Sequence, residues 1–144
     1  MAITSAICNS FKVEILTGTH NFTASTGDTF NLALYTSSAT LNKSTTAYTT
    51  SSEVASSGGY TAKGKALTSV TPVLSSDTAV CDFANISWTS ASFTSRGCLI
   101  FNDSAASDQS VCAIDFGGDK TVTSGTFTIE FPAATAGNAI IGIA

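Results

Sequence analysis

The sequence predicts an all-β fold: a single-domain antiparallel β-sandwich or jelly-roll-like domain that takes in residues 1–144. Three observations support this prediction. A chain of 144 residues suits one hydrophobic core. Its polar residues are mostly hydroxyls, 23 Thr and 21 Ser, which favour strands and turns over helix interiors. Short apolar runs recur between turn signals, a spacing that is typical of sandwiches and barrels.

Residues 6–16 carry two overlapping apolar patterns. Helical spacing relates Cys8, Phe11, Ile15 and Leu16, whereas strand alternation relates Phe11, Val13 and Ile15. Gly18 follows at the place where a helix commonly ends on a left-handed residue. We therefore favour a short helix over residues 6–16.

The next predicted element is a strand at residues 28–35, which follows a turn at 26–28. Phe30, Leu32 and Leu34 alternate with smaller or polar residues along it. This alternation predicts a half-buried strand with one face in the core.

Residues 36–59 contain only three large apolar side chains, Leu41, Tyr48 and Val54, among many hydroxyls. We interpret this segment as a long excursion from the core, of the kind that often carries a function. The alternative interpretation is one helical turn around Leu41 and an edge strand near Tyr48.

From Tyr60 onward the pattern becomes regular. It predicts strands at 60–67, 70–74, 79–88, 91–96, 97–102, 110–116, 121–131 and 139–143. The alternation changes phase within 79–88, which predicts a β-bulge near Phe83–Ala84. Two glycines, Gly117 and Gly118, predict a tight hairpin turn at Asp115–Lys120.

Charge and hydropathy disfavour two kinds of partner. The net charge is −4, and the six basic residues form no run or stripe, so we expect no nucleic-acid partner. The sequence has no window of about 18 apolar residues, so we expect no membrane partner. Residues 1–8 lack the basic and apolar regions of a signal peptide, which predicts folding in a cytosol.

The four cysteines, Cys8, Cys81, Cys98 and Cys112, are predicted to be free thiols because a cytosol is reducing. Cys98 and Cys112 lie inside apolar runs, where cysteine behaves as a small hydrophobic residue. The spacing shows no CxxC motif and no Cys/His cluster, so no metal site is predicted.

No catalytic or cofactor-binding residue is predicted, and we expect no enzyme activity. The single histidine, His20, has no nucleophile motif near it, and we expect it to form a structural hydrogen bond across the turn before Asn21. Five aspartates could in principle supply a glycosidase pair, but no spacing selects two of them, and we expect turn residues. They are Asp82, Asp103, Asp108, Asp115 and Asp119. The rings of Tyr48, Tyr60 and Trp88 could stack on a sugar, but Trp88 continues an apolar phase that predicts the core.

The low charge favours a subunit of a large assembly. Charged residues make up 11% of the chain, whereas the surface of a soluble monomer carries about 25–35%. Small neutral groups pack closely against a partner, so much of the outside is expected to be interface. A stable hydroxyl-rich monomer would have the same composition.

Six segments carry a resemblance to a known family. They are Asn9–Leu16, His20–Phe22, Phe30–Thr36, Tyr60–Leu67, Trp88–Phe101 and Asp115–Lys120. Through them the chain resembles a family of small tailed-bacteriophage virion proteins over nearly its whole length. Cys98 and Cys112 depart from the pattern, where we expect Ala or another small apolar residue.

The resemblance implies a non-enzymatic structural component, first of all a capsid cement or decoration protein that stabilises the head lattice. Its partners would be the major capsid protein and further copies of itself, as a homotrimer at local three-fold positions. Its location would be the virion, assembled in the host bacterial cytoplasm. The alternative is a fibre or receptor-binding module of the tail or neck that recognises a host-surface glycan. The family offers no catalytic residues to carry over.

Overall fold

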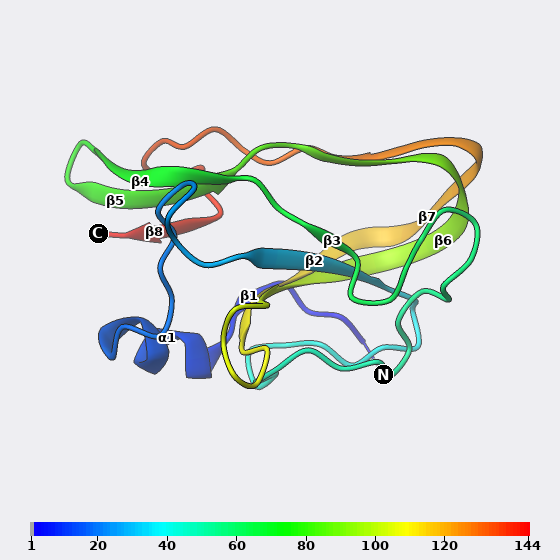
Figure 1. Cartoon of the computed structure of the whole chain (residues 1–144), viewed down its shortest axis with the longest axis horizontal. Helices are drawn as coiled ribbons and strands as arrows, with labels where there is room; N and C mark the ends of the chain where they lie inside the picture. Colours follow the sequence, from blue (N-terminus) through cyan, green and yellow to red (C-terminus); the bar gives the residue numbers. More distant parts are fainter. Residues whose placement is uncertain (1) are drawn as a thin grey trace.

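A computed structural model describes residues 2–144 and confirms the all-β sandwich (Figure 1). One antiparallel sheet has five strands in the order β1-β7-β6-β2-β3, and the other has three in the order β4-β5-β8. The elements are β1 (Ala6–Ile7), α1 (Asn9–Leu16), β2 (Phe30–Tyr35), β3 (Lys65–Ala66), β4 (Ser69–Ser75), β5 (Thr78–Phe83), β6 (Ile86–Asn102), β7 (Ser110–Ile129) and β8 (Ile141–Ile143). No helix among the described residues is both long and apolar enough to cross a membrane.

Both ends of the chain follow the sequence pattern closely. The predicted helix forms as α1, but it begins at Asn9 because Ala6–Ile7 pair with β7 as β1. The predicted C-terminal strand forms as β8, where Ile141 pairs with Cys81 of β5. Ile141 is buried, so the hydrophobic effect holds this short strand in place.

The face of β2 that was predicted to be exposed is in fact buried. Ala33 and Tyr35, on the opposite face from Leu32 and Leu34, are fully covered. The segment 36–59 lies over this face and contains no helix and no extended strand; it contacts the sheet through isolated bridges such as Glu53 with Tyr35. The segment has no regular structure, so the alternative of a helical turn and an edge strand is wrong. It does not leave the core, however, because Leu41 and Val54 are buried in the two core clusters.

Two other strand predictions need correction. Of residues 60–67 only β3 is a strand, because Lys63 and Gly64 adopt left-handed backbone with φ of 71° and 67°. The predicted strand 79–88 is two strands, since β5 ends at Phe83 and β6 begins at Ile86. The phase change near Phe83–Ala84 marks the crossing from one sheet to the other, not a β-bulge.

The two longest strands join segments that were predicted to be separate. β6 runs through the boundary between 91–96 and 97–102, and β7 runs through the predicted turn at Asp115–Lys120. Figure 1 shows the two strands passing together from one layer to the other through a shared bend. They connect the layers of the sandwich covalently and by hydrogen bonds.

The predicted hairpin at Asp115–Lys120 is a bulge within β7. Ser95 pairs with Lys120 and Gly97 with Asp115, so β7 carries extra residues opposite a short step of β6. Arg96, within that step, donates to Asp115 at 3.1 Å. Gly117, with φ of 80°, supplies the left-handed residue that lets the strand bulge and continue.

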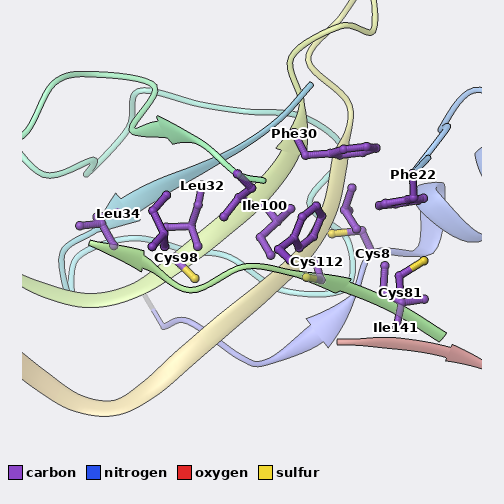
Figure 2. Packing of buried hydrophobic residues seen from close by; sticks show 14 of the residues in the cluster. Cys8, Phe22, Phe30, Leu32, Leu34, Cys81, Cys98, Ile100, Cys112 and Ile141 are labelled. Atoms are coloured by element: carbon purple, nitrogen blue, oxygen red, sulfur yellow. The ribbon is translucent and has the colours of Figure 1, made fainter. Parts of the chain in front are cut away.

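The main core lies between the two sheets. Figure 2 shows side chains from both sheets directed into one space, among them Leu32 and Ile100 from the five-stranded sheet and Cys81 and Ile141 from the other. A second, smaller cluster lies between the five-stranded sheet and the 36–59 excursion, and it includes Tyr35, Leu41, Leu99 and Phe101.

Candidate functional site

His20 is a structural residue with partners other than those predicted. Its side chain is fully buried, and Asn102 Nδ2 lies 3.1 Å from Nδ1 and donates to it. The ring proton is therefore assigned to Nε2, which lies 3.4 Å from Glu14 Oε1. Asn102 also donates to Asp28 at 2.8 Å. His20 thus joins α1 to the end of β6 instead of bridging its own turn.

Four of the five candidate aspartates form ion pairs. Lys63 Nζ lies 3.0 Å from Asp103 and 2.8 Å from Asp108. Arg96 lies 3.1 Å from Asp115 and 3.8 Å from Asp119.

Asp115 and Asp82 show what these carboxylates do locally. The amide of Gly117 and the guanidinium of Arg96 hold the pKa of Asp115 below its usual value, the opposite of what a general acid needs. Asp82 accepts a hydrogen bond from the amide of Phe83 at 2.8 Å. Both side chains satisfy backbone groups at an irregular point of a strand.

Two of the three aromatic residues considered for sugar binding are buried, and the third, Tyr48, is partly buried. Tyr60 and Trp88 are each 3% exposed. Tyr48 stacks on Phe101 with 4.8 Å between ring centroids, and Lys63 Nζ lies 5.7 Å from its ring. The structure therefore leaves none of these rings as a free platform for a sugar.

Glu53 is a polar hub that the sequence analysis did not single out. Its carboxylate accepts hydrogen bonds from the Tyr48 hydroxyl at 2.6 Å, the Tyr60 hydroxyl at 2.7 Å and the Lys63 amide at 2.8 Å. The Tyr60 oxygen accepts in turn from the Leu34 amide at 2.9 Å. Partial burial and the bond to Glu53 raise the pKa of Tyr48 to about 12. The one sequence signal is that Glu53 is the only acidic residue in the segment 36–59.

All four cysteines are buried free thiols, as predicted. Burial raises the pKa of Cys81 to about 11 and that of Cys112 to about 12. Burial also raises the pKa of Cys8 and Cys98. Nucleophilic chemistry needs an accessible thiolate, so these side chains serve packing.

The elements α1, β4 and β8 lie at one end of the molecule (Figure 1), and each of them carries exposed apolar side chains; we call this the apolar end. Leu16 is 87% exposed, Leu74 72% and Ile143 54%. Leu74 and Ile143 lie in one row across the sheet because both pair with Ala79. Leu16 and Ile143 line a shared groove of about 310 Å³. The apolar end comprises Leu16, Leu74 and Ile143. Val70 and Val73 are also exposed, but they lie on the other face of β4, because they pair with Asp82 and Val80.

A second apolar surface lies where the sandwich opens along β7. The first part of β7 lies in one layer and its last part in the other, with a groove of about 460 Å³ between them. We call this hollow the β7 groove. The large apolar side chains that line it are Ile7, Ile114, Phe116, Ile129, Phe131 and Ile140. These residues are partly buried and pack against the core. Groups that continue a core and are left partly exposed are typical of an interaction site.

The outward positions around the β7 groove are neutral hydroxyls. Thr121, Thr123, Thr126 and Thr128 are exposed along β7. Two of them bond across to β6, Thr121 to Thr94 and Thr128 to Ser87, each at 2.8 Å. The long ribbon thus presents a hydroxyl face on which Thr121 and Thr128 are bonded within the protein.

Comparison of the chain with protein-family models, with curated proteins and with solved structures gave no match.

Proposed function

We propose that this chain is a non-enzymatic structural protein of a bacteriophage virion, a capsid cement protein that binds the major capsid protein and other copies of itself. The proposal unites the family resemblance of the sequence with one observation, the apolar end. Leucine and isoleucine side chains that are more than half exposed and adjacent are costly in water and are stabilised by a protein partner.

The charge distribution supports a partner surface made of neutral and apolar groups over a highly charged partner. Lys63 and Arg96, two of the six basic residues, form ion pairs with aspartates of the same chain. The remaining outer surface is rich in Ser and Thr. A contact made of neutral and apolar groups depends weakly on salt, which suits attachment to a capsid lattice at varying ionic strength.

The mechanism is thermodynamic linkage. A protein that binds only the assembled shell stabilises that shell in proportion to the logarithm of its own free concentration over Kd, about 2.7 kcal/mol per site at a hundredfold excess. The stabilising free energies of the many sites on one shell add together. Their sum helps the shell to resist the pressure of the packaged DNA.

The test uses particles assembled without this protein. We expect them to keep their shape, to release DNA at a lower temperature, and to regain thermal resistance when purified protein is added. Leu74→Asp should bind these particles far more weakly than the wild type, with an unchanged melt in isolation because Leu74 is exposed. Ser57→Asp, on an exposed loop, is the matched control.

The receptor-binding alternative makes the opposite prediction. Particles without the protein would then resist heat normally but adsorb poorly to host cells. Normal thermal resistance with failed adsorption would overturn the cement proposal.

A further inference from the structure

The apolar end presents a projecting side chain and, beside it, a groove. Leu74 is 72% exposed and lies at the end of β4, next to the turn that leads into β5. The groove of about 310 Å³ lies between α1 and β8 and is lined by Leu16 and Ile143. Figure 1 shows the β4–β5 turn, α1 and β8 at this one end of the molecule. A surface that carries both features is complementary to a second copy of itself.

Two charged residues at the apolar end form no ion pair within residues 2–144. Lys12 lines the groove between α1 and β8 and is exposed. Asp77 is exposed in the turn between β4 and β5. The groove thus carries a cation, and the hairpin that projects beside it carries an anion. Two such ends attract each other when the hairpin of one meets the groove of the other.

The apolar and charged residues follow matching orders on the hairpin and in the groove. Leu16 is the last residue of α1, and Lys12 lies one helical turn before it. Leu74 lies within β4, and Asp77 follows it in the turn at the tip of the hairpin. A hairpin that enters the groove tip first therefore brings Leu74 to Leu16 and Asp77 towards Lys12.

The spacing of these residues allows both contacts at once. The three residues from Leu74 to Asp77 span at most about 11 Å, and the helical turn from Lys12 to Leu16 rises about 5.4 Å. The long side chain of Lys12 covers the difference. A two-fold axis repeats the arrangement, so each copy inserts its hairpin into the groove of the other.

We infer that the apolar end is a homotypic interface: two copies of this chain dock end to end about a two-fold axis, with Leu74 of each copy in the α1–β8 groove of the other and Asp77 of each copy beside Lys12 of the other. The inference rests on the proposed function in one respect, that a protein partner covers the apolar end, and it names that partner. It specifies a two-fold dimer, whereas the family resemblance implies a homotrimer.

Sedimentation equilibrium of the purified protein tests the pairing. The contact is small, so we expect monomer and dimer in exchange, with the dimer dominant at high protein concentration. Its Kd should rise about tenfold in Lys12→Glu and in Asp77→Lys, since each reversal places like charges together at two sites. The double variant Lys12→Glu/Asp77→Lys should restore most of the wild-type affinity. Lys120→Glu, the same change of charge at an exposed position of β7, should leave the Kd unchanged.

A cross-link tests which groups meet. A short bismaleimide should join the Lys12→Cys protein to the Asp77→Cys protein when the two are mixed, because the inferred contact places these positions together. The four native thiols are buried and do not compete. The control is a mixture of Lys12→Cys with Ser57→Cys, which should not cross-link. Ser57 is exposed beside the bend of β6, where the amide of Ser92 donates to the Gly58 carbonyl.

Four results would overturn the inference: a monomer at every concentration, a trimer, a dimer insensitive to both charge reversals, or no cross-link between the Lys12→Cys and Asp77→Cys proteins. Because these measurements use no particles, they are independent of the virion role. A protein that restores heat resistance to particles but does not dimerise would overturn the inference and leave the proposed function standing. A protein that dimerises but leaves the heat resistance of particles unchanged would do the reverse.

Discussion

Replacement of Glu53 by alanine tests how the long excursion is held on the sheet. The carboxylate of Glu53 accepts three hydrogen bonds, from Tyr48, Tyr60 and the amide of Lys63. Glu53→Ala leaves all three donors without this acceptor. Tyr60 is affected most, because it is 3% exposed and water cannot replace the lost partner.

The magnitude follows from the burial of each donor. An unsatisfied buried donor costs about 1–3 kcal/mol. Tyr60 should fall in the upper part of that range, the Lys63 amide in the lower part, and Tyr48, which is nearer to solvent, should contribute little. The sum is about 3 kcal/mol, which corresponds to a fall in Tm of about 12 °C for a chain of this size.

Urea denaturation followed by tryptophan fluorescence measures this effect, because Trp88 packs against Tyr60 with 6.2 Å between ring centroids. Glu53→Gln keeps an acceptor oxygen and should lose less stability than Glu53→Ala. Asp77→Ala, at an exposed acid in the β4–β5 turn, should change the free energy of unfolding by less than about 0.5 kcal/mol. A loss below about 1 kcal/mol in Glu53→Ala would refute the idea that this hub fixes the excursion.

Two further predictions concern the core. In the native protein at pH 8, an alkylating reagent should label none of the cysteines rapidly, because burial raises the pKa of all four thiols. After denaturation without reductant, the intact mass should show four labelled cysteines. A mass that shows two intact disulfides would contradict this. Deletion of residues 139–144 removes β8 and the buried Ile141, so it should cost about 3 kcal/mol and lower Tm sharply or leave the protein insoluble; an unchanged cooperative melt would show that β8 is dispensable.

The sequence by itself determined the fold class and the elements whose pattern is local. Strand alternation at Phe30–Leu34 and at Phe127–Ile129 needs no partner to be recognised, because side chains alternate along any strand. The existence of a helix ending at Leu16 and of a C-terminal strand followed from apolar spacing in the same way, whereas the start of α1 at Asn9 did not. Burial of the cysteines followed from their apolar neighbours.

The tertiary structure decided what covers each surface. β2 is buried on both faces because a segment without regular structure folds over it, and that segment carries no apolar period that would announce the contact. The pair Gly117–Gly118 is compatible with either a hairpin turn or a bulge. The structure has the bulge, and there Arg96 of the neighbouring strand donates a hydrogen bond to Asp115. The Glu53 hub joins residues 48, 53, 60 and 63 through loop geometry, which alternation does not encode.

Interaction surfaces also depend on tertiary arrangement. Leu16 and Ile143 are far apart in the chain, and each alone would read as an ordinary core residue. They form a surface because α1 and β8 meet at the end of the sandwich with nothing beyond them in the described chain. The spacing of apolar residues along the chain predicts which residues are stabilised by burial. Only the tertiary structure determines which of those residues stay exposed in the single chain.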